Sequence, residues 1–302
     1  MPDFIELAKE ASSPECVFID VPMSEKTTFR TGGNAAFFIA PATINELVDV
    51  IGVCEEKGVK FFVLGNGSNV LVKDGGFAGA VITTRGINKV ELKEHGKIRA
   101  EAGALLSKTA NFALDNDLAG LEFASGIPGT VGGAVYMNAG AYDRDIAGVF
   151  EKASALTVDG DIVELTNEEM NFSYRFSNAQ KNGYIILDVV FTLKNSVYID
   201  IKNEMLSLNK KREEKQPLNL PSAGSAFKRP QGNFAGKLIM EAGLSGFTIG
   251  GAQVSPKHCG FIVNIGGATA KDIISLVEHI QNTVFAEFSI ALEPEFKIIG
   301  DD

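Results

Sequence analysis

The stretch that decides the fold is Phe123–Tyr142, FASGIPGTVGGAVYMNAGAY. Its twenty residues carry no formal charge, and five of them are glycine. A transmembrane helix needs about 20 continuous apolar residues, and Pro128 together with the glycines excludes one here. Glycine adopts positive φ without a steric penalty, so such a segment lets backbone N–H groups approach a large planar or anionic ligand. The alternative is a set of tight turns in a crowded core.

A second stretch of the same character is Leu64–Val72, LGNGSNVLV, which follows the buried-type strand KFFVLG. It has the first two glycines of the GxGxxG fingerprint, but Val70 stands at the third position and no helix pattern follows. The dinucleotide fingerprint of a Rossmann fold is therefore not met. Two strand-flanked glycine loops, about 60 residues apart in the sequence, can still hold two ends of one extended cofactor.

The composition is that of a globular protein, with 45% hydrophobic and 22% charged residues in a chain of 302. This length fits two domains, or one large domain with an appendage. The net charge of −10 argues against nucleic acid or an anionic membrane as the main partner. Three cysteines and three histidines are scattered, which predicts neither a disulfide framework nor a metal site. The acidic, amphipathic N-terminus is unlike a secretory signal, so we expect a cytoplasmic protein without membrane insertion.

The periodicity of the chain predicts an α+β fold. A strand–helix–strand pattern with a Thr43/Glu46 capping box indicates a small α/β lobe over residues 1–80. Short strands joined by glycine turns, of which His95-Gly96 is one, indicate a mainly antiparallel lobe over residues 81–200. A basic helix ending near Lys215 then opens a smaller α+β domain over residues 201–302. There a helix capped by Thr269 runs to about Phe288, and ALEPEFKII is expected to form the last strand.

Eight motifs in one order make the sequence similar to a known family. They are TTFRTGGNAAFF, VLGNGSNVLV, GLEFASGIPGTVGGAVYMNAGAYDRDI, FSYRFS, KREEKQP, AGSAFK, GGAQVSPKHCGFIVN and LEPEF. Together they resemble the UDP-N-acetylenolpyruvoylglucosamine reductases (UDP-N-acetylmuramate dehydrogenases), flavoenzymes of peptidoglycan synthesis. The resemblance runs from about Val21 to Gly300, and its compact spacing is similar to the shorter, second subtype.

The resemblance implies a two-lobed FAD-binding domain of the vanillyl-alcohol oxidase kind over residues 1–200. A smaller α+β substrate-binding domain is implied over residues 201–302. The residues that match the family's FAD-facing positions are Arg30, Gly65, Asn66, Gly67, Ser68, Asn69, Ser125, Gly126, Ile127, Pro128, Thr130, Gly132, Gly133, Ala134, Asn138 and Gly140.

Three residues match the family's catalytic positions. Arg175 in FSYRFS would polarise the substrate, since a guanidinium fork suits a carboxylate that gains enolate character. Ser225 in AGSAF would donate a proton to carbon, which an alcohol can do only toward a base as strong as an enolate. Glu295 would hydrogen-bond the substrate carboxylate or share in that protonation. Considered without the family, the three are typical of a surface charge, a turn residue and an exposed strand charge.

Two further residues are expected at the substrate. Lys215 matches the family's lysine before the proline and would bind anionic groups, although a solvated helix end is the alternative. Arg229 stands where the family usually has asparagine, so its substrate contact departs from the pattern, as does Phe296-Lys297 after LEPE. The resemblance implies that NADPH, as co-substrate, reduces the FAD, which then reduces UDP-N-acetylglucosamine enolpyruvate to UDP-N-acetylmuramate.

Two other functions remain open at this level. One is a flavin oxidase or dehydrogenase with the same FAD domain and another substrate, in which the UDP-sugar would fail to oxidise the reduced flavin. The other is a nucleotide- or sugar-binding protein without catalysis, which would purify without a visible flavin band.

Overall fold

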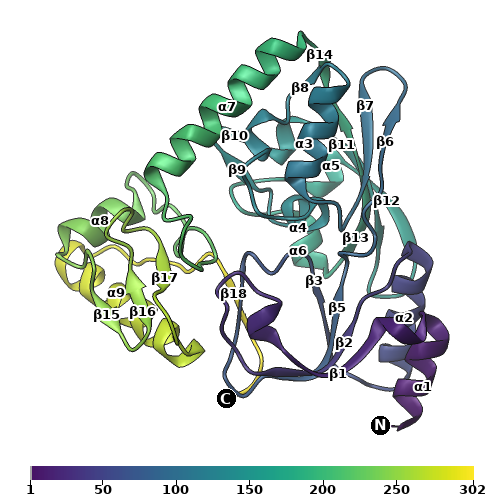
Figure 1. The fold of residues 1–302 in the computed structure, drawn as a ribbon, viewed down its shortest axis with the longest axis horizontal. Helices are drawn as coiled ribbons and strands as arrows, with labels where there is room; N and C mark the ends of the chain where they lie inside the picture. Colours follow the sequence, from purple (N-terminus) through teal and green to yellow (C-terminus); the bar gives the residue numbers. More distant parts are fainter. Residues whose placement is uncertain (1) are drawn as a thin grey trace. The chain divides into compact units, whose positions relative to one another are not determined.

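A computed structural model describes residues 2–302, and its packing divides the chain into two compact units (Figure 1). Unit 1 consists of Met1–Phe18, Phe37–Asn66 and Gly79–Arg212. Unit 2 consists of Ile19–Ala36, Gly67–Ala78 and Glu213–Asp302. This division describes packing and not function, so the expected boundary between an FAD-binding domain and a substrate-binding domain at residue 200 stays a prediction.

The first sheet has the strand order β1-β2-β5-β3. Its strands are β1 (Val17–Pro22), β2 (Asn34–Ile39), β3 (Phe61–Leu64) and β5 (Phe77–Thr83), and β3 runs parallel to β5. Helices α1 (Pro2–Ala11) and α2 (Ile44–Glu56) lie side by side (Figure 1). The Thr43 side chain caps α2 by accepting the Glu46 N–H, as predicted. The Glu46 carboxylate accepts from Ala42 instead of Thr43, so the predicted capping box is only half formed.

The second sheet is antiparallel throughout, with the strand order β12-β11-β13-β7-β6. The strands are β6 (Val90–Lys93), β7 (Lys97–Glu101), β11 (Phe150–Leu156), β12 (Ile162–Thr166) and β13 (Ile185–Thr192). His95 and Gly96 both have positive φ in the turn between β6 and β7, which confirms that His95 is a turn residue. This sheet is the predicted antiparallel lobe.

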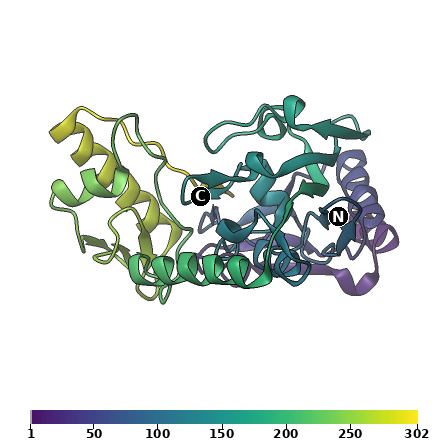
Figure 2. The same ribbon diagram turned by 90° about the horizontal axis from the view of Figure 1, so that it is seen from above.

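Helices cover this sheet and complete the core of unit 1. Helix α4 (Val131–Tyr136) packs on β13 and β7, and α3 (Leu106–Asp115) packs on α4. The long helix α7 (Tyr198–Lys215; Figure 2) is tied down by the Tyr142 hydroxyl, which donates to the Leu208 carbonyl at 2.8 Å. The smaller elements of unit 1 are η1 (Pro14–Cys16), β8 (Leu118–Ala119), η3 (Glu122–Ala124), β9 (Gly140–Ala141), β10 (Arg144–Asp145), η4 (Ile146–Gly148), α5 (Asn167–Met170), α6 (Asn178–Asn182) and β14 (Lys194–Asn195).

Unit 2 is built on a three-stranded sheet, β15-β16-β17, and two helices. The strands are β15 (Thr248–Ile249), β16 (Ala252–Val254) and β17 (Ile262–Asn264), and 3₁₀ helix η2 (Met23–Glu25) also belongs to this unit. Helix α8 (Ala235–Glu241) packs against the longer α9 (Ala270–Phe288), as Figure 2 shows. Thr269 and Asp272 form the capping box of α9, and the predicted start and end of this helix are confirmed.

A short parallel pair joins two distant parts of unit 2. Strand β4 (Val70–Val72) follows the second glycine loop, and it pairs with β18 (Lys297–Ile299) at the C-terminus. The predicted last strand was therefore too long, because Glu293–Glu295 precede β18. This segment is held instead by a single bridge between Pro294 and Phe227.

Candidate functional site

The two glycine loops meet within unit 1. The Asn66 side-chain amide donates to the Pro128 carbonyl at 2.7 Å, although the two residues are far apart in sequence. Gly65 lies so close to Thr130 that a Cβ on it would come within 2.4 Å of the threonine Oγ1. The structure therefore brings Gly65, Asn66, Pro128 and Thr130 together, as expected of loops that hold one ligand.

These loops offer unused backbone donors. Among residues 2–302, the N–H groups of residues 65–69 are paired with neither a backbone nor a side-chain acceptor. The same holds for the N–H groups of Gly126, Gly129 and Thr130 within the described chain. Neither loop contributes a carboxylate. Consecutive main-chain donors without nearby acidic groups suit an anion, so the residues present fit the pyrophosphate of the expected FAD.

Several glycines serve packing as well. A Cβ on Gly132 would lie 2.8 Å from the Cβ of Ala102, and the Gly132 N–H donates to the Ala102 carbonyl. A Cβ on Gly126 would lie 2.6 Å from the Asn209 side-chain oxygen on α7. At these positions glycine is needed because another part of the protein approaches closely. The tight-turn alternative therefore explains part of the glycine content.

The other residues expected at FAD in unit 1 lie along the same segment. Ser125 donates to the Glu122 carbonyl at 2.8 Å and lies 3.3 Å from the Asn209 side-chain oxygen. Asn138 is buried, and its amide donates to Asp145 and to the Ser173 carbonyl, so its side chain is engaged by the protein. Ile127, Gly133, Ala134 and Gly140 belong to this segment, and the assignment of all these residues to FAD stays a prediction.

The second half of the first loop belongs to unit 2. Gly67 has φ +63°, and its carbonyl accepts the Thr28 N–H at 3.0 Å. Arg30, two residues further on, has an exposed side chain and φ +54°. Asn69 donates its side-chain amide to the Glu295 carbonyl at 3.2 Å. Asn69 of the first glycine loop is thereby in direct contact with the expected catalytic residue Glu295. Ser68, between Gly67 and Asn69 in the sequence, is half-buried.

Arg175 is held in a strained turn in unit 1. Ser173 and Phe176 exchange backbone hydrogen bonds, so Tyr174 and Arg175 form the tip of a two-residue turn. Arg175 has φ +55°, which is rare for a residue with a side chain and is found more often at functional sites. Its guanidinium donates to the Gly140 carbonyl at 3.2 Å and lies 5.0 Å from the Tyr174 ring centre.

Ser225 and Glu295 are positioned by one residue of unit 2, Ala226. The Glu295 N–H donates to the Ala226 carbonyl at 2.9 Å, and the Ala226 N–H donates to the Gly260 carbonyl at 2.7 Å. Ser225 itself forms a β-bridge with Phe261. The Ser225 side chain is exposed and follows Gly224, whose φ is +77°. Two expected catalytic residues, remote in sequence, are thus placed on neighbouring backbone segments.

The two expected substrate residues lie on exposed parts of unit 2. Lys215 is the last residue of α7, and Arg229 stacks on Phe234 at 4.4 Å from the ring centre. The Lys228 ammonium, next to Arg229, pairs with Glu293 at 2.5 Å. Their contact with a substrate stays a prediction.

Sequence reasoning overlooked Arg212. It lies on α7 within KREEKQP, and its Cδ is 3.0 Å from the Cβ position of Gly126. Burial lowers the pKa of the Arg212 guanidinium, and the Tyr142 hydroxyl opposes that effect. Within residues 2–302 no carboxylate pairs with it. A half-buried cation beside Gly126 could hold an anionic group. The available signal in the sequence was that Arg212 follows Asn209 by three residues, a spacing that places two side chains on one face of a helix.

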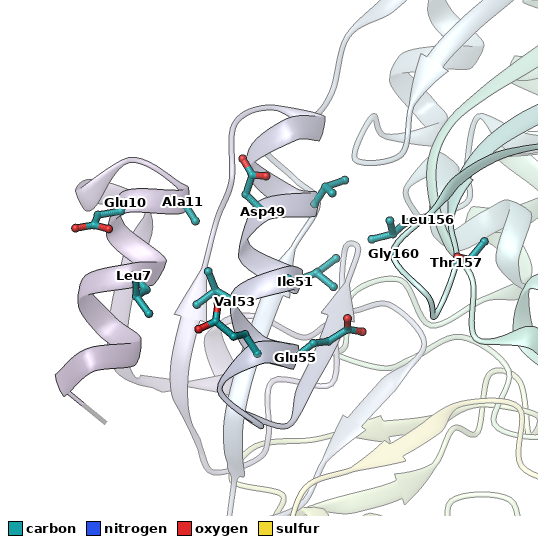
Figure 3. Close-up of a pocket in the computed structure, with 13 residues that line it drawn as sticks. Leu7, Glu10, Ala11, Asp49, Ile51, Val53, Glu55, Leu156, Thr157 and Gly160 are labelled. Atoms are coloured by element: carbon teal, nitrogen blue, oxygen red, sulfur yellow. The ribbon is translucent and has the colours of Figure 1, made fainter.

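Unit 1 also has a pocket of about 560 Å³, whose lining residues Figure 3 shows. It is formed by α1, α2 and the turn after β11, and none of the expected site residues lines it. Glu10, Asp49, Glu55 and Glu56 contribute carboxylates to its wall. Because these negative charges repel a pyrophosphate, the pocket does not fit FAD.

Within the described chain, no group of three or more His, Cys, Asp or Glu side chains could hold a metal ion. Over residues 2–302, every helix is too short or too polar to cross a lipid bilayer.

Two family models match the chain. The model described as "UDP-N-acetylenolpyruvoylglucosamine reductase, C-terminal domain" matches residues 216–299, and the model described as "FAD binding domain" matches residues 35–166. UDP-N-acetylenolpyruvoylglucosamine reductase of Clostridium perfringens (strain SM101 / Type A) is 47% identical over 300 residues, which cover 99% of this chain and 98% of the relative. The enzyme of the same name from Clostridium botulinum (strain Hall) is 49% identical over 286 residues, covering 95% and 93%.

Solved structures agree with these relatives. The crystal structure of UDP-N-acetylenolpyruvylglucosamine reductase from Thermus caldophilus is 35% identical, with a TM-score of 0.79 over 93% of this chain and 97% of that chain. P-cresol methylhydroxylase is 11% identical, with a TM-score of 0.51 over 97% and 66%, and it shares the fold alone. The α+β architecture predicted from the sequence, with an FAD-binding domain of the vanillyl-alcohol oxidase kind, is confirmed.

Proposed function

The chain belongs to the UDP-N-acetylenolpyruvoylglucosamine reductase family, and from this premise we propose that it reduces UDP-N-acetylglucosamine enolpyruvate to UDP-N-acetylmuramate with NADPH. It is an FAD-dependent oxidoreductase of peptidoglycan synthesis. The observation that supports this most directly is the meeting of the two glycine loops, with Asn66 donating to Pro128 beside a run of unpaired N–H groups. The free thiols of Cys16, Cys54 and Cys259 fit a reducing cytoplasm.

The residues that would hold FAD are those of the two loops. In unit 1, the N–H groups of Gly65, Asn66, Gly126 and Thr130 would bind its pyrophosphate, with Arg212 as the nearby cation. In unit 2, Gly67, Ser68, Asn69 and Arg30 match further FAD-facing positions of the family. FAD bound there would supply the redox chemistry, namely transfer of a hydride equivalent, derived from NADPH, to the terminal enolpyruvyl carbon. The neighbouring carbon then needs one proton to complete the lactyl ether.

Ser225 would provide that proton. Its side chain is exposed, while its backbone is fixed by the bridge to Phe261. An alcohol is a weak acid, so the transfer is favourable only toward the strongly basic carbon of an enolate. The serine proton goes to carbon, and the resulting alkoxide is reprotonated from water.

Arg175, Glu295 and Lys215 would act on the substrate's charges. The Arg175 fork would stabilise the carboxylate as it gains enolate character. Glu295 would hydrogen-bond that carboxylate or share in protonation, held by its N–H to Ala226. Lys215 would bind the anionic UDP portion, with Arg229 as a further cation.

An anaerobic spectral experiment tests the function. We expect the purified protein to be yellow, to bleach when NADPH is added, and to regain its colour when the enolpyruvyl UDP-sugar follows. A colourless protein favours a binding protein without catalysis. Bleaching by NADPH without recovery by the sugar favours a flavin enzyme with another substrate.

Replacement of Ser225 distinguishes the protonation of substrate from the reduction of FAD by NADPH. Ser225→Ala should still bleach with NADPH, because hydride transfer to FAD does not use this hydroxyl. Turnover should fall by about 10²- to 10⁴-fold, as for loss of a positioned proton donor. Stopped-flow absorbance measures both steps, and retained turnover removes Ser225 from the scheme.

A further inference from the structure

His258 occupies a defined place beside the expected proton donor. It lies in the turn between β16 and β17, and its Nδ1 accepts the Gly260 N–H at 3.1 Å. The half-buried ring meets Phe261 edge-on at 5.0 Å. A Cβ on Gly260 would lie 2.9 Å from the His258 ring, so only glycine lets the ring and this backbone come together.

This hydrogen bond assigns the protonation state of the ring. An imidazole nitrogen that accepts a hydrogen bond carries no proton, so the neutral ring has its proton on Nε2. Burial lowers the pKa of His258, a hydrogen bond with its own backbone opposes this effect, and the charge of Lys215 adds to the lowering. The residue of α8 that lies against the ring is Gly236, which carries no charge. Protonation of Nδ1 would set two donors against each other and break the contact with Gly260.

Gly260 also hydrogen-bonds the segment that carries Ser225. Its carbonyl accepts the Ala226 N–H at 2.7 Å, and Ala226 directly follows Ser225. The Ala226 carbonyl in turn accepts the Glu295 N–H at 2.9 Å. Three hydrogen bonds therefore connect the imidazole with the backbone that holds Ser225 and with that of Glu295.

We propose that His258 is a positioning residue for Ser225, whose neutral imidazole fixes Gly260 and, through Gly260, the segment Ser225-Ala226. The ring does not itself touch the reacting atoms. It sets the direction of the Ser225 backbone, and a small displacement of a proton donor costs much of its rate. This inference rests on the proposed role of Ser225, so it affects the step in which substrate is protonated and leaves the reduction of FAD by NADPH unchanged.

The experiment measures the two half-reactions separately by stopped-flow absorbance on the FAD-loaded protein. His258→Phe keeps a ring against Phe261 and removes the acceptor for Gly260. We expect the rate of flavin reoxidation by the enolpyruvyl UDP-sugar to fall about 10- to 100-fold, with the rate of bleaching by NADPH within about twofold of the unchanged protein. In the Ser225→Ala background, His258→Phe should add little further loss, because both changes act on one step.

A rescue variant and a control make the test specific. His258→Asn places a side-chain oxygen near the Nδ1 position and should recover most of the reoxidation rate. His279→Phe is the matched control, since the His279 ring stacks on Phe247 at 4.3 Å elsewhere in unit 2. Both of its half-reaction rates should stay unchanged.

Two readouts report on the ring directly. Nitrogen-15 NMR of the unchanged protein should show a protonated Nε2 and an unprotonated Nδ1 for His258 at neutral pH. The reoxidation rate should fall as the pH drops through the His258 pKa, which burial holds below its ordinary value of about 6.5, and His258→Asn should lack that decrease. These readouts decide the question even if His258→Phe does not fold.

Three results would overturn the proposal: His258→Phe slows both half-reactions alike, it slows neither, or the NMR spectrum shows the opposite tautomer. Failure of the proposed function looks different. In that case the unchanged protein is not bleached by NADPH, or the enolpyruvyl UDP-sugar does not restore its colour.

Discussion

Arg175 shows what a single residue's sequence context does and does not reveal. The motif FSYRFS predicted its participation, but nothing in the letters predicted φ +55° at the tip of a two-residue turn. Tertiary contacts fix that backbone: the Gln180 side chain donates to the Arg175 carbonyl at 3.1 Å, and the guanidinium reaches the Gly140 carbonyl. Such contacts join parts of the chain that local propensity does not relate.

Arg175→Lys should keep the positive charge and lose the planar fork. A lysine cannot bind a carboxylate through two parallel hydrogen bonds, so we expect kcat to fall about 10²- to 10³-fold. The visible FAD spectrum should be unchanged. Steady-state kinetics beside an absorbance spectrum measure both quantities, and an unchanged kcat would contradict the role proposed for Arg175.

The glycines differ in how closely other atoms approach them, which the sequence alone does not indicate. Gly132→Ala should destabilise the protein by about 1–3 kcal/mol, because the new methyl group meets Ala102 in a close-packed region. Gly52→Ala is the matched control: it lies in α2, where an added Cβ meets nothing within 4 Å. That change should stabilise by about 0.5–1 kcal/mol through helix propensity. Denaturant unfolding followed by circular dichroism measures both, and equal effects would contradict this account.

At the scale of elements, the long and well-capped helices and the hairpins could be predicted from the sequence. In α9 the apolar periodicity and the capping residues indicate the same helix, and Thr269 and Asp272 accept each other's N–H groups. The last strand was predicted too long, because apolar alternation in ALEPEFKII cannot reveal where a pairing partner ends. The two-residue strands β8, β9, β10, β14 and β15 also escaped prediction, because two residues are too few to show an alternating pattern. In addition, β8 and β14 pair with each other across a long stretch of sequence.

Thr269→Ala removes one half of the α9 capping box. The Thr269 hydroxyl accepts the Asp272 N–H at 3.0 Å, and loss of such a cap costs about 1 kcal/mol. We expect a matching loss in the free energy of unfolding, measured in denaturant. Thr269→Ser keeps the oxygen and should cost less than half as much, so equal losses for the two variants would argue against a capping role.

Asp272 makes the contribution of α9 to the free energy of unfolding depend on pH. The Thr269 N–H, followed by that of Gly251, holds the pKa of the Asp272 carboxyl below its usual value. Its folded pKa is lower than its unfolded one, so its stabilising contribution is complete above the unfolded pKa of about 3.9. The contribution is lost as the pH falls from that value through the folded pKa. Unfolding of Asp272→Asn should accordingly show a weaker acid dependence than that of the unchanged protein, and identical pH curves would contradict this.

At the scale of the whole molecule, the order of motifs predicted the fold class and the cofactor, but not how the segments are distributed. The strand β4 after the glycine loop pairs with β18 at the C-terminus, and Asn69 reaches the Glu295 carbonyl beside that pair. No local pattern encodes a pairing between such remote strands. The compact units consequently interleave along the chain instead of following one another.

Shortening the chain tests this pairing. A chain that ends at Phe296 lacks β18 and leaves β4 without its partner, so we expect unit 2 to lose its structure and the protein to lose its yellow colour. A chain that ends at Asp301 keeps all of β18 and the hydrogen bond from the Asp301 N–H to the Gly76 carbonyl. It loses the Lys73–Asp302 pair, in which Asp302 is exposed and which contributes little. Circular dichroism and the flavin absorbance of the two proteins measure the difference, and a yellow, folded protein ending at Phe296 would contradict the importance of the pair.

The position of β18 also has a consequence for biosynthesis. Translation adds about 5–20 residues per second, so roughly ten to forty-five seconds separate the synthesis of β4 from that of its partner. Throughout that interval the nascent polypeptide carries a strand whose edge is unsatisfied, a state that invites association with other chains. Folding of unit 2 must therefore wait until β18 has been synthesised, and chaperones that shield exposed edges would act on the chain before then.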